Sequence, residues 1–425
     1  MISKTNQISN GVKELFSKKW FIVFVLISLL FFQLIYSFLF PPYGLNDNWQ
    51  PVSTYLPKFT VESTDNFILG KIYPFVSPEY RLNSDVGNYL ELAQNFNSRY
   101  FEHHVFLNRP LYPFLIFLSS LPLRLFTEPS YGLIFALAIF VNFILISLAV
   151  LLFFYFLRKL FSSKVAWLSS ILLIFSPFVH SYLIQPLAEM FMALAVVLSA
   201  YLLYNYIRKP SFPKLIVFSL IIGTLMLGKM FFAISFFILI LSLYFRRYKE
   251  GFTFLIIHLV PFLLWYLWIT QVWQISYFSL EIQRQNMGVW LFSIFQWPWY
   301  EITRVFFTAI PNFITALIYS FILIPIIFSV IGLKLLPFKS KNIIYFSSLF
   351  SVLALSFLTT IYLYRHAFLL FPIIYPTCIL GIERVAGFLK RYQSWYSCLF
   401  YVIIISLIIF VSNINIHEIF HYLEL

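Results

Sequence analysis

Charged residues and cysteines are scarce in this chain of 425 residues. Charged side chains make up 11% of it and cysteine occurs twice, whereas hydrophobic residues account for 61% and the mean hydropathy is +0.86. A soluble domain of this size cannot hide that much apolar surface, so the composition excludes one and predicts a membrane protein with many spans. Cys378 and Cys398 both lie in apolar segments, which gives no sign of a disulfide framework.

The formal net charge of +13 would suit a protein that binds nucleic acid, but the distribution of the charge does not. Lysine and arginine occur in short clusters between apolar segments, as the orientation signals of membrane proteins do. We therefore expect membrane lipids as partners and no nucleic acid. We see no pattern of a cleavable signal. The first apolar stretch, Trp20 to Phe40, is long enough to span the bilayer and remain there.

The distribution of basic residues also predicts the orientation of the chain. Four lysines precede the first span, which places the N-terminus in the cytoplasm. The polar stretch from Pro41 to about Asn108 carries, together with the adjoining Arg109, seven acids and five bases and is expected outside. The next segment, Arg109 to Phe126, is short and contains three prolines, so an interfacial or re-entrant helix is predicted. If this segment does not cross the membrane, fifteen basic residues of five later loops lie inside and four lie outside. If it crosses, the numbers are inverted. Because basic residues are favoured in cytoplasmic loops, we expect that it does not cross.

The predicted fold class is an all-α polytopic membrane protein with about eleven transmembrane helices. Residues 1–425 form a single integral membrane domain, and residues 41–130 form its first extracytoplasmic loop, with interfacial or re-entrant helices. We expect a multi-pass protein of the cell (cytoplasmic) membrane with an extracytoplasmic C-terminus. The predicted spans after the first are 131–157, 165–184, 187–207, 215–228, 231–245, 252–272, 306–332, 342–362, 367–383 and 395–413.

The stretch "SDVGNYLELAQNF", Ser84 to Phe96, predicts a short polar helix in that loop. Apolar residues from Val86 to Phe96 recur at helical spacing, so one face of the helix can lie on the membrane. Asp85 falls in the first turn, where the helix dipole favours its ionised form. An ionised carboxylate suits a general base. The alternative is that Asp85 only helps to cap the helix.

Other ionisable residues are expected on the same outer side. Glu189 lies in "YLIQPLAEMF" at the turn between two spans, and an acid at that depth usually faces a polar cavity. Arg109 precedes "PLYP", Lys229 lies at the tip of a predicted hairpin, and Arg365 and His366 lie in "LYRHAF". Each can be an ordinary loop acid or a side chain that snorkels to the interface. Together they suit an anionic ligand whose head lies at the membrane surface.

Two groups of histidines have a spacing or clustering that metal-binding sites also show. "HEIFH", His417 to His421, matches the H-E-x-x-H zinc pattern, but it follows the last span and no third ligand is evident, so we do not expect a zinc protease. His103 and His104, in "FEHH", can contact an acceptor or can be solvated loop histidines.

The order "SDVGNYLELAQNF" followed by "FLNRPLYPFLIFL" resembles the GT-C membrane glycosyltransferases, in the branch of protein O-mannosyltransferases and aminoarabinose transferases. That family has an acid in its first outer loop, a Tyr-x-x-x-Ala helix and a basic segment, which Asp85, Tyr89, Ala93 and Arg109 match in this order. Its second acid corresponds to Glu189. Its later basic positions correspond to Lys229, where arginine is usual, and to Arg365 before "FPIIYP". The Pro-Pro doublet of the family is a single proline here.

The resemblance implies transfer of a sugar from a polyprenyl-phosphate-linked donor to a glycan, lipid or protein acceptor, with inversion. Asp85 would be the general base, and the other matched residues would bind substrate. Whether a divalent metal binds at Asp85 and Glu189 stays open. Two alternatives also stay open: a flippase or transporter of lipid-linked glycans, and an O-antigen polymerase or ligase. A transporter more often has ionisable residues inside its spans or inverted repeats.

Overall fold

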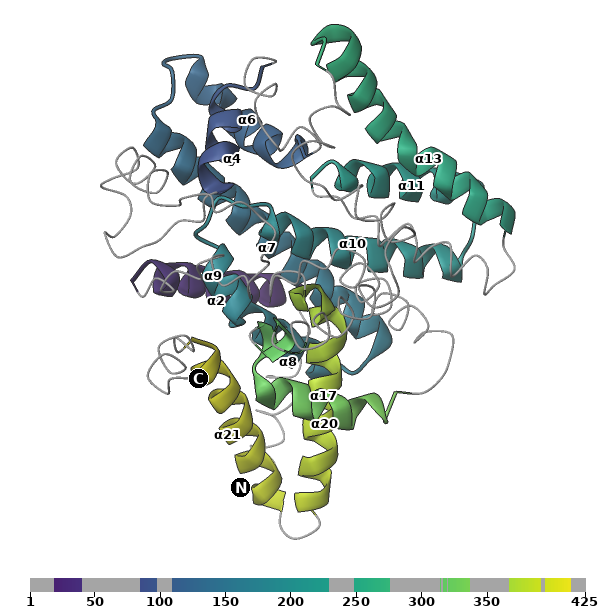
Figure 1. Cartoon of the computed structure of the whole chain (residues 1–425). Coiled ribbons are helices and arrows are strands. Elements are labelled where there is room, and N and C mark those ends of the chain that lie inside the picture. Colours follow the sequence, from purple (N-terminus) through teal and green to yellow (C-terminus); the bar gives the residue numbers. More distant parts are fainter. Residues whose placement is uncertain are drawn as a thin grey trace, which may run out of the picture.

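A computed structural model of the chain describes residues 19–39, 85–97, 109–228, 248–275, 314–336 without 315 and 319, 367–390 and 394–413. Every regular element in these ranges is a helix (Figure 1). Within them, six helices are long and apolar enough to cross a membrane: Trp20–Leu39, Tyr131–Leu160, Glu189–Tyr206, Tyr248–Val272, Phe368–Leu389 and Trp395–Ser412. The all-helical class predicted from the composition is therefore confirmed, with helices of the length and apolarity of membrane spans.

The centre of the molecule is built from α2 (Lys19–Leu39), α7 (Tyr131–Leu160), α8 (Ser163–Ile174) and α10 (Glu189–Arg208), as Figure 1 shows. α7 packs against the other three, and most of its apolar side chains are buried. Serine caps begin α7 and α8, because the hydroxyls of Ser130 and Ser162 accept bonds from backbone N–H groups three residues ahead. α7 ends in Arg158 and Lys159, which the negative end of a helix dipole favours.

The predicted span 165–184 is two helices rather than one. α8 ends at Ile174, and the six-residue α9 (Pro177–Tyr182) follows. Ser176 caps α9, with its hydroxyl 3.2 Å from the backbone nitrogen of Val179, and Pro177 occupies the first turn. Serine followed by proline is a start signal for a helix and interrupts the one before it. The break matters because α9 leads into the turn that positions the start of α10.

A second group of helices lies to one side in Figure 1: α11 (Phe212–Met226) packs along α13 (Tyr248–Leu267). α13 contains Pro261 and continues as the π-helical turn η2 (Trp268–Val272). Gln274 follows with a φ of 56°, in the left-handed region that non-glycine residues seldom adopt. The chain therefore changes direction sharply just after this predicted span.

A third group contains α17 (Leu323–Leu333), α20 (Phe371–Leu389) with the preceding 3₁₀ turn η3 (Phe368–Leu370), and α21 (Ser394–Asn413). α17 and α20 approach so closely that neither Gly332 nor Gly381 has room for a Cβ atom against the other helix's backbone. The hydroxyls of Ser329 and Thr377 hydrogen-bond across the same contact at 2.5 Å. Small residues and hydroxyl pairs of this kind are typical of helix contacts in membranes.

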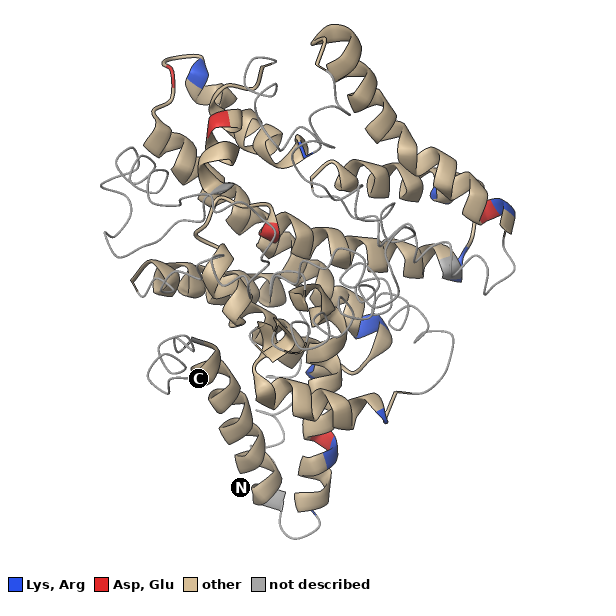
Figure 2. Ribbon diagram, viewed as in Figure 1, with Lys and Arg blue, Asp and Glu red and all other residues tan. Residues whose placement is uncertain are grey.

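Charged residues are few along the helices and gather near their ends and connections (Figure 2). The clearest ion pair among the described residues joins Lys164 and Glu383 at 3.7 Å, next to a contact of Lys164 with the ring of Tyr401. Predicted spans 231–245 and 342–362 lie outside the described residues, and 306–332 lies within them only in part.

Candidate functional site

Two short helices, α4 (Asp85–Gln94) and α6 (Leu111–Arg124), pack on each other and on α7. α4 begins at Asp85, as the sequence pattern predicts, and α6 has 14 residues, fewer than the roughly 20 needed to cross a bilayer. The apolar face of α4 was expected to lie on the membrane. Instead it is buried, and α4 contacts α6 and α7. Arg124 of α6 links this helix to α4, because it donates a 2.7 Å hydrogen bond to the backbone carbonyl of Gln94.

Tyr89 and Tyr112 join α4 to α6. Tyr89 lies one turn after Asp85 on α4, and its ring meets that of Tyr112 edge to face, with 5.3 Å between the ring centroids. Both rings are buried. Residues four apart share one face of a helix, so Asp85 belongs to the face that carries Tyr89, about 6 Å along the helix axis. The helix that begins at Asp85 is thus joined to α6 through Tyr89 and Tyr112.

Asn142 connects α6 to the turn before α10. The hydroxyl of Tyr112 donates to the side-chain oxygen of Asn142 at 2.8 Å. The side-chain nitrogen of Asn142 donates to the carbonyl of Gln185 at 2.6 Å, and the carbonyls of Tyr182 and Leu183 lie at 3.4 Å. Asn142 is fully buried, so these bonds are formed away from water. They hold the segment between α9 and α10 in place.

That segment leads into Glu189 and fixes its position near Tyr112. Glu189 is the first residue of α10 and is only 1% exposed. A carboxylate in the first turn gains from the positive end of the helix dipole. It lies near enough to Tyr112 for its charge to affect that hydroxyl. Two acidic segments more than ninety residues apart in sequence, those of Asp85 and Glu189, therefore meet around Tyr112.

Tyr112 acts in this arrangement as a neutral hydrogen-bond donor. Burial raises the pKa of its hydroxyl well above the usual 10, and the neighbouring Tyr89 and Glu189 raise it further, whereas the bond to Asn142 opposes the rise. The phenol is accordingly protonated near neutral pH and does not supply a base.

Arg109 lies two residues before α6, with its Nε atom buried. Two residues later, the backbone nitrogen of Leu111 donates a 3.1 Å bond to the carbonyl of Leu227 at the end of α11. Gly228 follows and packs against the ring of Phe191, leaving no room for a Cβ atom. The chain segments that carry Arg109 and Glu189 and the one that leads into Lys229 thus converge.

The remaining predicted site residues lie outside the described residues: Lys229, Arg365, His366, His103, His104 and the side chain of Asp85. The same holds for His417 to His421 and Ser84. The segment just after His366 is described. There Phe368 stacks on Phe178 of α9 at 3.7 Å, and η3 packs against α10.

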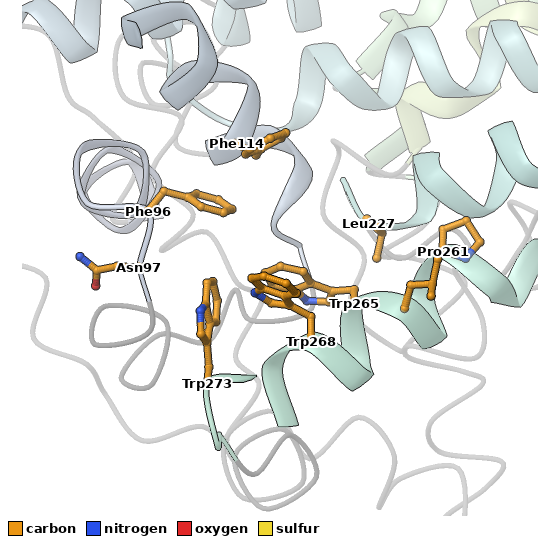
Figure 3. A pocket seen from close by; sticks show the side chains of 9 residues that line it. Phe96, Asn97, Phe114, Leu227, Pro261, Trp265, Trp268 and Trp273 are labelled. Carbon is orange, nitrogen blue, oxygen red and sulfur yellow. The ribbon is translucent and has the colours of Figure 1, made fainter. Parts of the chain in front are cut away.

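An open cleft of about 680 Å³ lies beside the start of α6 (Figure 3). We call it the aromatic cleft. Its lining includes Trp265, Trp268, Trp273, Phe96, Phe114 and Leu227. Three of these residues come from α13, η2 and the turn after it, Phe114 comes from α6, and Phe96 follows α4. Leu227 belongs both to this lining and to the bond with Leu111, so the cleft adjoins the Arg109 segment.

Tyr112 and Asn142 were not among the residues that the sequence patterns indicate. Asn142 had a readable signal, since it is an amide inside a 30-residue apolar helix, and polar groups at such positions are usually functional or hydrogen-bonded. Tyr112 had none beyond its place in "RPLYP". Within the described ranges, no three His, Cys, Asp or Glu side chains are grouped to hold a metal ion, and the metal suggested at Asp85 and Glu189 stays a prediction.

Comparisons of the chain with protein-family models, curated proteins and solved structures find no match.

Proposed function

We propose that the protein is a membrane glycosyltransferase of the GT-C kind. It moves a sugar from a polyprenyl-phosphate-linked donor to a glycan, lipid or protein acceptor at the extracytoplasmic face. One observation supports this above the others: Tyr89 of the Asp85 helix and Glu189 both lie around Tyr112. A transferase of this kind needs carboxylates beside a lipid surface, and the arrangement supplies two acidic segments at one place.

The proposal includes the topology. The chain crosses the cell membrane about eleven times, with the N-terminus in the cytoplasm and the C-terminus outside. The positions of basic residues support this orientation. Arg158 and Lys159 end α7, and Arg208 ends α10. The Glu189 end of α10 and the start of α7, beside α4 and α6, then belong to the opposite, outer side.

The chemistry is a direct displacement. The acceptor hydroxyl oxygen attacks the anomeric carbon, the bond from that carbon to the phosphate oxygen breaks, and polyprenyl phosphate leaves with the electron pair. Asp85 takes the hydroxyl proton, as a general base must. A single displacement inverts the anomeric configuration. Glu189 and Tyr89 orient the sugar, and His103 and His104 contact the acceptor.

The leaving phosphate gains negative charge, and cations placed beside it lower the barrier. Arg109, Lys229, Arg365 and His366 fill this role. Replacing Arg365 by alanine should weaken donor binding by about 1.5–3 kcal/mol, the usual cost of losing a charge-assisted bond to phosphate, and Lys229→Ala should have a smaller effect. Unchanged donor affinity in both variants would place the cationic site elsewhere.

The direct test uses the full chain in lipid nanodiscs. It is given radiolabelled polyprenyl-phosphate hexoses and pentoses, with a cell-envelope glycan extract as acceptor. The proposal predicts release of polyprenyl phosphate together with label in the acceptor. Glu189→Gln should lower kcat/KM by roughly tenfold to a hundredfold, as for loss of one charged hydrogen bond.

Glu250→Gln is the matched control. Glu250 also lies in the first turn of a candidate span and accepts a 2.5 Å bond from Tyr206, but at the end expected inside. This variant should transfer sugar at the normal rate. A wild-type protein that moves labelled donor between the leaflets of a liposome, with no sugar transferred to acceptor, would indicate a flippase instead.

A further inference from the structure

The C-terminal ends of α7 and α10 bring two cations to one place. The two helices pack along each other, and Lys159 lies in the last turn of α7 whereas Arg208 ends α10. The Nζ atom of Lys159 donates to the hydroxyl of Tyr201 at 3.1 Å and to the side-chain oxygen of Asn205 at 3.3 Å. It also lies 4.3 Å from the centroid of the Tyr201 ring. The cation of α7 is therefore held on the surface of α10.

Arg208 reaches the same turn of α10 from its other end. Its guanidinium donates to the hydroxyl of Tyr204 at 3.2 Å and lies 5.6 Å from the centroid of that ring. Phe156 of α7 packs edge to face on both tyrosines, with centroid distances of 6.4 Å to Tyr201 and 5.8 Å to Tyr204. The packed rings thus direct both cations to the single turn of α10 that residues 201–205 form.

The charge of these two cations is not neutralised by a carboxylate within the described part of the chain. Lys159 and Arg208 contact neutral oxygens and rings there, and both side chains are exposed. Glu250 accepts its bond from Tyr206, which lies two residues after Tyr204 and so on the opposite side of α10. An ammonium has three donors and a guanidinium five, so donors remain for an anion.

An accessible apolar stripe leads to the cations along each helix. On α10, Leu194 and Leu198 are half-buried and precede Tyr201 at helical spacing. On α7, Leu148 is 50% exposed and lies eleven residues before Lys159, which is about three turns and about 16 Å along the same face. Half of the hydrocarbon core of a bilayer measures about 15 Å. The stripe therefore has the length of one leaflet.

The geometry points to the ends of α7 and α10 as a binding place for an anionic phospholipid, with Lys159 and Arg208 on its phosphate and an acyl chain along the stripe. Basic sites between the ends of spans are typical of places that bind anionic head groups, and tyrosines gather at that depth. In the proposed orientation the site faces the cytoplasmic leaflet. The inference goes beyond the proposed sugar transfer and does not depend on it.

The test is native mass spectrometry of the purified full chain in detergent, titrated with phosphatidylglycerol or with phosphatidylcholine of the same acyl chains. The first phosphatidylglycerol should bind more tightly than phosphatidylcholine. Lys159→Gln combined with Arg208→Gln should weaken its binding about thirtyfold, roughly fivefold for each cation beside an anionic lipid. Tyr201→Phe keeps the ring but removes the hydroxyl that holds Lys159, so it should cause a smaller loss.

The matched control is Lys164→Gln combined with Lys214→Gln, which removes the same charge. Lys164 pairs with Glu383 at 3.7 Å, and Lys214 donates to the backbone carbonyl of Lys209 at 3.1 Å. This variant should bind phosphatidylglycerol almost as the wild type does. Equal losses in the two double variants would show diffuse attraction between a basic surface and an acidic lipid, and would overturn the inference.

Two further results would also refute the site. Equal affinity of the wild type for the two lipids would remove the requirement for an anionic head group. Displacement of phosphatidylglycerol by millimolar inorganic phosphate would indicate a site for the free anion, in which the apolar stripe has no part.

Discussion

Asn142→Leu tests how the fold positions Glu189. The change keeps the side chain similar in size and removes two short hydrogen bonds, from Tyr112 at 2.8 Å and to Gln185 at 2.6 Å. The two contacts at 3.4 Å are too long to add much. Hydrogen bonds between helices in membranes contribute about 0.6 kcal/mol on average and about 1.7 kcal/mol at most. Two of them predict a loss of about 1–3 kcal/mol in the free energy of unfolding.

The measurement is unfolding of the purified full chain in mixed detergent micelles, as a function of denaturing detergent. Ser147→Ala is the matched control, because Ser147 lies on the same helix but donates only to its own turn, to Phe143 at 2.6 Å. A double-mutant cycle of Asn142→Leu with Tyr112→Phe should give a coupling of about 0.6–1.7 kcal/mol. A coupling indistinguishable from zero would refute the Tyr112–Asn142 bond and the positioning role derived from it.

The loop Lys334–Lys341 should be cytoplasmic and the tail His417–Leu425 extracytoplasmic, as cysteine labelling with membrane-impermeant reagents can measure; a cytoplasmic tail would overturn the count of eleven spans. Gly381→Val should destabilise the protein by about 1–3 kcal/mol or more in the same unfolding assay, because its side chain would meet the backbone of α17. Gly387→Ala, where a Cβ atom meets nothing within 4 Å, should be neutral or slightly stabilising; equal losses in both variants would contradict the close packing of α17 on α20.

Much of the helix plan could be predicted from the sequence, because hydrophobic length and charge clusters act locally. The beginnings of α4 at Asp85 and of α7 at Tyr131 follow from an acid or a serine placed before a periodic apolar run. The short α6 follows from prolines that bound and interrupt the segment. These features depend on neighbours within a few residues.

The features that shape the site depend on contacts between distant segments, and the sequence patterns missed them. To predict the role of Asn142, one must know that α6 and the turn after α9 lie on either side of it. The π-helical turn that places Trp273 has no distinct sequence signal. The sequence predicted that the apolar face of α4 lies on the membrane, whereas this face is buried in the protein. The helical spacing of apolar residues identifies such a face but does not identify what covers it.

The most direct test of the proposed mechanism is Asp85→Asn. The variant has nearly the same size and can still accept bonds at the start of α4, so the fold and the Tyr89–Tyr112 contact should persist. An amide cannot accept the proton of the attacking hydroxyl. Loss of a general base lowers turnover by roughly a hundredfold or more. The measurement is kcat at saturating polyprenyl-linked sugar, with donor binding measured in parallel.

Asp85→Glu should give an intermediate rate, because the carboxylate is retained but displaced by one methylene group. Glu91→Gln supplies the control on the same helix, since Glu91 lies six residues on and away from the face that Asp85 shares with Tyr89. This control should keep normal turnover. If Asp85→Asn also turns over normally on saturating donor, Asp85 is only a helix cap. That result would remove the mechanism proposed here.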